Sequence, residues 1–163
     1  MLLVKQAQRG DPDAFIELIE KYKKDLYKTA KAYLKREEDV ADAMQDTILS
    51  AWEHIGDLRK AAYFKTWLTR ILINHCNDIL SERKRCMLTE GIAAEADTRA
   101  EQSDTDFYEM ISCLPEKYRS IFLLYYGQGF KAREIAEILD INENTVKSRL
   151  KRGRLVLKKQ LIL

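Results

Sequence analysis

Apolar side chains recur every three or four residues along most of this 163-residue chain, and no segment alternates with period two. This spacing is typical of amphipathic helices. The pattern lapses at residues 86–105, where Ala, Glu, Asp and Thr predominate and few large apolar groups are available for a core. We therefore predict an all-α protein of two small helical domains, residues 1–85 and 106–163, joined by a flexible acidic linker, residues 86–105.

Local start and stop signals place the predicted helices. Asp11 can cap a helix that starts at Pro12, since proline lacks an N–H and the N–H groups of a first turn have no partner within the helix. A charged break follows at residues 36–39. Three helices are predicted in the first domain and four in the second, at about residues 12–33, 39–55, 65–84, 106–113, 115–126, 131–139 and 143–161.

Charge is distributed unevenly along the chain, although the formal net charge is only +2. Residues 107–163 carry eleven Lys and Arg against six Asp and Glu, whereas residues 86–106 carry one Arg against six acids. A basic end beside an acidic connector indicates a polyanion as the partner of the basic end.

Cysteine usage and hydropathy bear on the compartment. Cys76, Cys86 and Cys113 lack any CxxC spacing, so we expect reduced thiols rather than a disulfide or a zinc site. The sequence shows neither a signal-peptide pattern nor an apolar stretch that approaches the length of a membrane span. These features together predict a cytoplasmic protein.

A basic segment near the end of the chain, residues 140–154, carries the most specific functional signal. It follows the predicted helix 131–139 after a break that allows only a tight turn, and Asn142 can cap the new helix. The apolar anchors expected on this helix are Val146, Leu150, Leu155 and Leu157. The side chains left for its exposed faces are Lys147, Ser148, Lys151, Arg152 and Arg154. This arrangement is typical of a helix-turn-helix that binds the DNA major groove, the alternative being a solvated basic helix end.

The second predicted helix carries a polar stripe at spacings of three and four: Asp42, Gln45, Asp46, Leu49 and Glu53. One interpretation is a metal-bound carboxylate cluster of Asp39, Asp42 and Asp46. Acids at helical spacing more often face solvent, however, and no histidine lies on the stripe. A face that mixes acids, an amide and one leucine favours a protein-docking surface, and we expect no metal.

Bases and aromatics are interleaved where the second helix connects to the third: Arg59, Lys60, Tyr63, Phe64, Lys65, Trp67 and Arg70. This combination suits single-stranded nucleic acid, because aromatic faces stack on unpaired bases while cations contact phosphates. The alternative is that the aromatics are core residues, which we favour for Trp67. Further along the third helix, Asn74, Asn77 and Asp78 could hydrogen-bond base edges.

Motifs for catalysis are missing from the sequence. It contains no nucleophile–base pair, phosphate-binding Gly-rich loop or Walker motif, and His54 and His75 are isolated. We therefore predict no enzyme activity, no catalytic residue, no cofactor and no small-molecule substrate.

Short motifs along the chain follow a characteristic order. The first group is Asp42-Ala43-Met44-Gln45-Asp46 with Ala51-Trp52, then Phe64-Lys65-Thr66-Trp67-Leu68, then Asn74 and Asp78. This group resembles the sigma-two domain of extracytoplasmic-function (ECF) sigma factors, group 4 of the sigma-70 family. The second group resembles their sigma-four domain: Leu114-Pro115, Glu134-Ile135-Ala136 and Thr145-Val146-Lys147-Ser148-Arg149-Leu150. The resemblance covers nearly the whole chain outside the linker.

The resemblance implies a bacterial RNA polymerase specificity subunit that directs promoter-specific initiation. In that family the acidic second helix docks on the clamp helices of the largest polymerase subunit, a role that falls here to Asp42, Gln45, Asp46 and Leu49. The polymerase flap, promoter DNA and an anti-sigma factor, often membrane-anchored, are the other implied partners. The linker is implied to thread toward the active-site channel and the RNA exit path.

The resemblance also implies two contacts with promoter DNA. The residues implied to melt the minus-ten element and hold an unpaired base are Arg59, Lys60, Tyr63, Phe64, Lys65, Arg70, Asn74 and Asp78. Those implied to read the minus-thirty-five element in the major groove are Lys147, Ser148, Lys151 and Arg152. Phosphate contacts are implied for Thr145, Arg149 and Arg154.

Three positions depart from the family pattern. Ser81 replaces a common Arg, so basic contact there would have to come from Arg83 to Arg85. Asp140 replaces the usual turn Gly, and Asn144 replaces a common Gly at the start of the recognition helix. Aspartate can adopt the left-handed conformation at some cost. These departures concern the promoter sequence rather than the function.

Two other functions stay open at the level of sequence. A stand-alone helix-turn-helix regulator would bind duplex operators without polymerase, but it leaves the acidic stripe and the aromatic loop unexplained. A metal-dependent enzyme acting on nucleic acid would require Asp39, Asp42 and Asp46 to converge in space.

Overall fold

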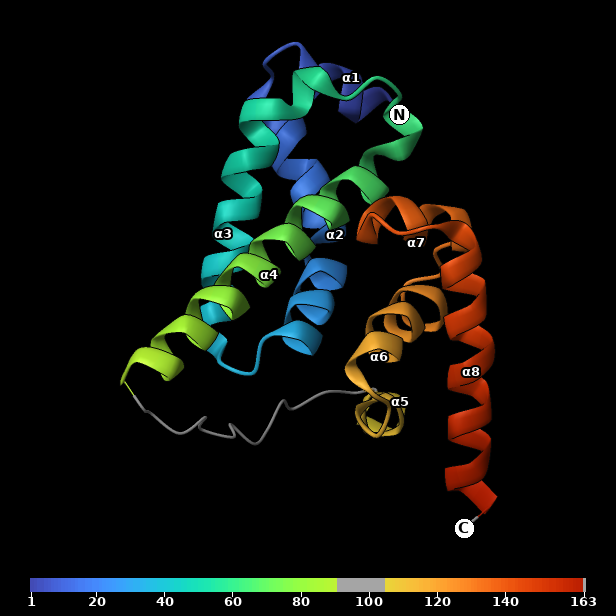
Figure 1. The fold of residues 1–163 in the computed structure, drawn as a ribbon. Helices are drawn as coiled ribbons and strands as arrows, with labels where there is room; N and C mark the ends of the chain where they lie inside the picture. Colours follow the sequence, from blue (N-terminus) through green and yellow to red (C-terminus); the bar gives the residue numbers. More distant parts are fainter. Residues whose placement is uncertain (91–104, 163) are drawn as a thin grey trace. The chain divides into compact units, whose positions relative to one another are not determined.

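The computed structural model describes residues 1–90 and 105–162 (Figure 1). Within these residues the regular secondary structure is helical and no strand occurs, which confirms the all-α prediction. The chain divides into two compact units, Met1–Thr98 and Arg99–Leu163. The predicted linker, residues 86–105, falls largely outside the described residues, and its flexibility stays a prediction.

The first unit is a helical bundle built around two long helices, α2 and α4 (Figure 1). Its elements are α1 (Leu2–Gln8), α2 (Pro12–Tyr33), α3 (Glu37–His54), η1 (Ile55–Asp57), η2 (Ala61–Tyr63) and α4 (Phe64–Glu90). Helix α4 packs against both α2 and α3, and α1 packs against α2 and η1. The sequence pattern does not predict α1, which spans 7 residues and lacks a side-chain cap.

The core of the first unit forms where the apolar stripes of α2, α3 and α4 meet. Its buried side chains include Leu18, Leu26, Ala30, Val40, Ala43, Ala51, Phe64, Leu68 and Leu72. The inward positions predicted for α3 are buried or, at Met44, half-buried. The period of the sequence therefore identified the inner face of this helix correctly.

Helix α2 begins as the sequence predicts. The Asp11 side chain accepts hydrogen bonds from the backbone N–H groups of Asp13 and Ala14, at 3.0 and 3.4 Å. Pro12 occupies the first helical position, where its missing N–H costs nothing.

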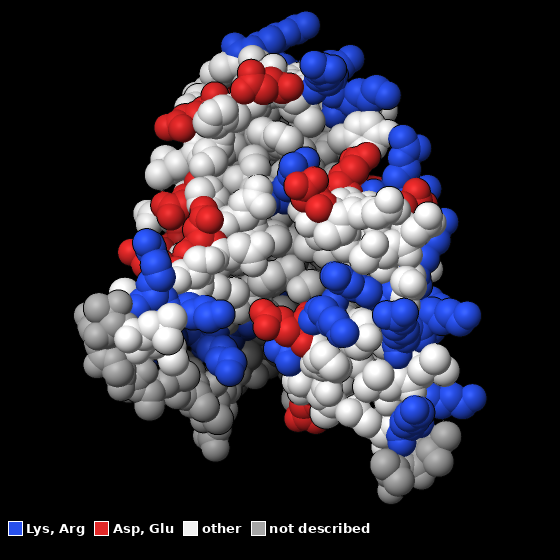
Figure 2. All heavy atoms as spheres, in the orientation of Figure 1, with Lys and Arg blue, Asp and Glu red and all other residues white. Residues whose placement is uncertain are grey.

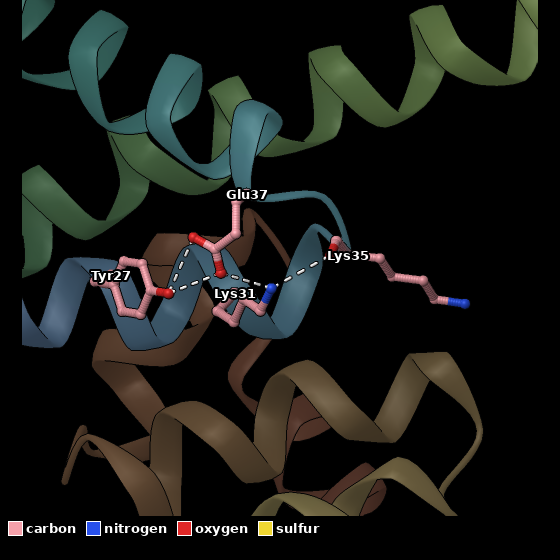
Figure 3. A network of polar contacts seen from close by, with 4 residues as sticks. All are labelled: Tyr27, Lys31, Lys35 and Glu37. Carbon is pink, nitrogen blue, oxygen red and sulfur yellow. Dashed lines mark hydrogen bonds and ion pairs between the residues drawn. The ribbon is translucent and has the colours of Figure 1, made fainter. Parts of the chain in front are cut away.

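A polar network joins the last turns of α2 to the first turn of α3 (Figure 3). The Glu37 carboxylate accepts a hydrogen bond from the Tyr27 hydroxyl at 2.8 Å and pairs with the Lys31 ammonium at 2.8 Å. Lys31 also donates to the Lys35 carbonyl at 3.3 Å. The hydrogen bonds from Lys31 and then Tyr27 lower the pKa of Glu37, so the carboxylate is charged at neutral pH. The network therefore links the last turns of α2 to the first turn of α3.

Helix α4 is longer than predicted. It continues from the basic run at residues 83–85 to Glu90, so the predicted domain boundary at residue 85 lies inside a helix. Arg, Lys, Met and Leu are good helix formers, which explains why the helix does not stop where the apolar pattern fades.

The described residues of the second unit form five elements, of which α8 is the longest (Figure 1). They are α5 (Thr105–Ser112), α6 (Glu116–Phe122), the π-helical turn η3 (Leu123–Gly127), α7 (Ala132–Leu139) and α8 (Glu143–Ile162). Both α6 and α7 pack against α8. The single helix predicted at residues 115–126 is therefore an α-helix that ends in a π-helical turn.

The inner face of α8 differs from the prediction at one position. Val146 and Leu150 are buried as expected, but Leu155 is 54% exposed. Gly153 is buried in its place and Leu157 is half-buried, so the inward positions follow a spacing of three and four. The prediction of Leu155 as an anchor was wrong, because Gly153 and not Leu155 occupies the inward position after Leu150.

Gly153 allows a close approach between α8 and α6. A Cβ atom at this position would lie 2.3 Å from Cε2 of Phe122, whose ring is buried in the unit. Any side chain at residue 153 would therefore displace α8 or the ring.

The turn between α7 and α8 uses the conformation expected from the sequence. Asp140 has φ 54 and ψ 50, the left-handed region, and is the non-glycine residue with positive φ in the described part of the chain. Asn142 caps α8, because its side-chain oxygen accepts a hydrogen bond from the Asn144 N–H at 2.8 Å. Both expectations for this turn are confirmed.

We expect Asp140→Gly to stabilise the second unit by about 1 kcal/mol, because glycine adopts left-handed backbone without the Cβ clash. Chemical denaturation followed by far-UV circular dichroism would measure this gain. Both tryptophans, Trp52 and Trp67, lie in the first unit, so the transition followed by tryptophan fluorescence should not move. A loss of stability would show that the Asp140 side chain contributes more than its conformation costs.

Candidate protein and nucleic-acid interfaces

The polar stripe of α3 lies on the surface. Asp42, Gln45 and Asp46 are exposed, and Leu49 is 57% exposed although it is aliphatic. On the opposite side of the helix, the buried Thr47 hydroxyl donates to the Ala43 carbonyl at 2.6 Å. The bundle therefore presents two acids, an amide and a leucine together, and Figure 2 shows acidic side chains gathered on this side of the first unit.

Asp39 does not join the other acids of this helix. It is buried, and its carboxylate accepts two hydrogen bonds from Arg83 of α4, at 2.5 and 2.6 Å. Asp39, Asp42 and Asp46 therefore do not converge, and the described residues contain no group of three His, Cys, Asp or Glu placed to hold a metal ion.

The same ion pair changes the interpretation of the basic run on α4. The hydrogen bond to Asp39 raises the pKa of Arg83 and holds its guanidinium against α3. Arg83 was expected to supply a basic DNA contact in place of the residue at position 81. Asp39 engages Nε and Nη2 of Arg83, while the side chain stays 39% exposed, so the DNA contact expected of Arg83 stays a prediction.

The connection between α3 and α4 presents cations and one aromatic ring. Arg59 and Lys60 are exposed, and Tyr63 is 41% exposed. The Lys60 ammonium lies 5.6 Å from the centroid of the Tyr63 ring, in cation–π range. These three side chains form the surface that we call the aromatic-basic loop.

Phe64 was predicted in the same set, but it is a core residue. Its ring is 2% exposed and packs against the rings of Tyr22 and Trp67, with centroids 5.7 and 5.9 Å away. A buried ring cannot stack on a base, so Phe64 is removed from the candidate contacts. The preference for a packing role at Trp67 is supported by the same contacts.

The polar residues predicted along α4 share one exposed stripe. Arg70, Asn74 and Asp78 are spaced by four residues and are all exposed. Lys65, one turn earlier, is half-buried and lies 3.6 Å from the Asp25 carboxylate of α2. His75 is not isolated as the sequence analysis has it, because its Nε2 lies 3.1 Å from the Ser50 hydroxyl of α3.

Gln8 is a residue near the aromatic-basic loop that the sequence does not reveal. Its side-chain amide donates to the carbonyls of Ile55 and Leu58, at 2.9 and 2.8 Å. The partners lie 47 and 50 positions away, so no local motif signals the contact.

The candidate reading face of α8 is exposed where the sequence predicts it. Lys147, Ser148, Lys151 and Arg152 are exposed, and Thr145 and Arg149 are half-buried at the flanks. Lys147 lies 3.4 Å from Glu143 one turn before it, an ion pair between exposed groups that a phosphate or base could displace. Figure 2 shows Lys and Arg side chains along α8.

Arg154 is held by a tyrosine from the π-helical turn. Its Nε donates to the Tyr126 hydroxyl at 2.7 Å, and its guanidinium carbon lies 5.9 Å from the centroid of that ring. The bond to the tyrosine hydroxyl uses only the Nε–H, which leaves the donors of the two terminal nitrogens for another group. This geometry suits a phosphate contact.

Comparison with known proteins gives matches over both units. Residues 18–86 match the family described as Sigma-70 region 2, and residues 105–157 match Sigma-70, region 4. RNA polymerase sigma factor SigV of Bacillus subtilis (strain 168) is 31% identical over 149 residues, which cover 90% of each chain. ECF RNA polymerase sigma factor SigW of the same organism is 29% identical, over 97% of this chain and 94% of SigW.

Solved structures show the same fold. CnrH, solved in complex with the cytosolic domain of CnrY, is 26% identical with a TM-score of 0.74, covering 98% of this chain and 95% of CnrH. The sigma factor RpoE of Bartonella quintana, solved with the anti-sigma factor NepR, has a TM-score of 0.77 at 24% identity, over 91% and 97% of the two chains.

No helix among the described residues is long and apolar enough to cross a membrane.

Proposed function

The chain belongs to the ECF sigma factors of the sigma-70 family, and we propose that it binds core RNA polymerase and directs it to specific promoters. The observation that carries the proposal is that three distinct exposed surfaces occur on one chain, at the positions where the family resemblance puts them. They are the acidic stripe of α3, the aromatic-basic loop and the basic face of α8. We keep residues 1–85 and 106–163 as the two functional domains, with α4 extending the first to Glu90.

The acidic stripe is the proposed site for the polymerase. Asp42, Gln45 and Asp46 offer charge and hydrogen bonds, while the exposed Leu49 offers an apolar anchor within the same patch. A partner with basic side chains around an apolar contact fits such a surface, because charge complementarity selects the partner and apolar burial supplies affinity. The clamp helices of the largest polymerase subunit are the proposed partner, and the flap is proposed to contact the chain as well.

The first unit is proposed to open and hold the minus-ten element. Tyr63 can stack on an unpaired base while Arg59 and Lys60 contact phosphates. Arg70, Asn74 and Asp78 continue the surface along α4, and the half-buried Lys65 is its least accessible member. The cost of unstacking a base is met by contacts that form only with the open strand.

The second unit is proposed to read the minus-thirty-five element. Lys147, Ser148, Lys151 and Arg152 would face base edges in the major groove, and the half-buried Thr145 and Arg149 would join Arg154 on the phosphates. The path of the linker through the polymerase, also part of the proposal, concerns residues outside the described part of the chain. An anti-sigma factor, which in this family is often membrane-anchored, is proposed to hold the protein inactive.

The alternative of a stand-alone regulator is tested by the same experiment as the proposal. Run-off transcription on a genomic library, with core polymerase and with or without this chain, should give transcripts that depend on the chain and share two upstream elements. Tight binding of promoter duplex by the free chain, without chain-dependent transcripts, would instead support the stand-alone regulator.

We expect Asp46→Ala to weaken binding to core polymerase about tenfold, equivalent to about 1.4 kcal/mol, because it removes a charge at the centre of the acidic stripe. Titration of a fluorescently labelled chain with core polymerase measures this loss. Glu17→Ala, which removes an exposed acid from α2, is the matched control and should bind normally. Binding of minus-thirty-five duplex to the Asp46 variant should not change, and equal loss of both activities would contradict the division of roles.

We expect Arg152→Ala to cost about 1–3 kcal/mol on the preferred duplex and to relax specificity at one base pair, as loss of a base contact does. Arg154→Ala should weaken binding to all duplexes alike and reduce the salt dependence by about one counterion, as loss of a phosphate contact does. Anisotropy titrations on matched and mismatched duplexes at several salt concentrations separate these effects. The same profile for both variants would remove the distinction between base and phosphate contacts.

A further inference from the structure

The start of the aromatic-basic loop depends on a contact from a distant part of the chain. The Leu58 N–H donates to the Ile55 carbonyl at 3.3 Å, and the Tyr63 N–H donates to the Lys60 carbonyl at 3.0 Å. The first of these turns shapes η1 and the second shapes η2. Between them the backbone at Leu58 and Lys60 is extended. The orientation of Arg59 and Lys60 therefore depends on what holds the turn at Leu58.

Gln8 holds that turn. Its Nε2 donates to the Ile55 carbonyl at 2.9 Å and to the Leu58 carbonyl at 2.8 Å. The Ile55 carbonyl also accepts the Leu58 N–H, so Gln8 adds a second hydrogen bond to it, and the same amide donates its other hydrogen to the Leu58 carbonyl. The contact thus links Ile55, the first residue after α3, to Leu58, the residue at which the loop turns outward.

Helix α1 is anchored firmly enough to hold the loop in place. Val4 and Ala7 are buried against the core of the first unit. After the helix, the Gly10 N–H donates to the Ala7 carbonyl at 3.0 Å, and the Asp11 N–H donates to the Gln6 carbonyl at 3.2 Å. Gln8 therefore extends from a fixed backbone, and its two hydrogen bonds restrain the loop rather than α1.

We propose that Gln8 is a positioning residue for the minus-ten contact, which holds the aromatic-basic loop in the shape that selects an unpaired base. This inference rests on the proposed function of the loop. The amide hydrogens of Gln8 are engaged by the two carbonyl oxygens, so its proposed role is to position the loop. Its loss should therefore reduce the discrimination between bases more than it reduces binding of polymerase or the stability of the fold.

The test uses Gln8→Met, which keeps the length of the side chain and removes both donors. Gln8→Glu is the second variant, since it keeps the shape and also lacks the N–H groups. Gln6→Met, at a half-buried position on the same helix, is the matched control. Each chain is assembled with core polymerase, and the holoenzyme is titrated with two single-stranded oligonucleotides. One carries the minus-ten sequence found by run-off transcription, and the other carries the same bases in scrambled order.

The measured quantity is the ratio of the two affinities. For Gln8→Met we expect the ratio to fall about five- to tenfold, the effect of losing one or two neutral hydrogen bonds. Gln8→Glu should lower it at least as far, because its carboxylate faces the same two carbonyl oxygens. The Gln6 variant should keep the wild-type ratio. If Gln8 had only a structural role, its loss would lower the fraction of active holoenzyme and weaken the binding of both oligonucleotides equally. The ratio of the two affinities would then stay unchanged.

Three outcomes overturn the inference. An unchanged ratio in both Gln8 variants shows that the loop selects its base without Gln8. A fall of equal size in the Gln6 control shows that any change in α1 has this effect. If the wild-type holoenzyme does not discriminate between the two oligonucleotides, the proposed role of the loop fails, and the inference fails with it. The wild-type measurement distinguishes this outcome from the first one.

Discussion

The first unit depends on one packing contact, the burial of the inner stripe of α4 against α2 and α3 together. Phe64, Leu68, Leu72 and Cys76 lie along this stripe and are buried. Burial raises the pKa of the Cys76 thiol to about 12, so the side chain stays neutral and packs as a small apolar group. Because the inner face is fixed in this way, the outer face of α4 and the loop before it are presented to solvent in a defined register.

The polar contacts of the first unit secure both ends of α3. At its start, Glu37 binds Lys31 and Tyr27 of α2, and Asp39 binds Arg83 of α4. At its end, Gln8 binds the carbonyls of Ile55 and Leu58. The acidic stripe lies between these contacts. A helix held at both ends loses little conformational freedom on binding, which favours affinity for a rigid partner.

Local signals predicted much of this molecule. The Asp11 cap, the Asn142 cap and the left-handed Asp140 each depend on residues close in sequence. The exposure of Asp42, Gln45, Asp46 and Leu49 follows from the period of a single helix. The failures at Phe64 and Leu155 reflect packing between helices, since Phe64 packs against Tyr22 of α2 and Gly153 takes the inward position beside Phe122 of α6. Gln8 belongs with them, because only the fold brings it to the loop.

The close contact of Gly153 with Phe122 separates how α8 is held from the side chains that it exposes. The inner face has no room for a side chain at residue 153. The distance between α8 and α6 is therefore set by contact of the α8 backbone with the Phe122 ring. The residues of the outer face, including Lys147, Ser148 and Arg152, are exposed and contribute little to this packing. New binding preferences could thus be selected from libraries of outer residues on an unaltered scaffold.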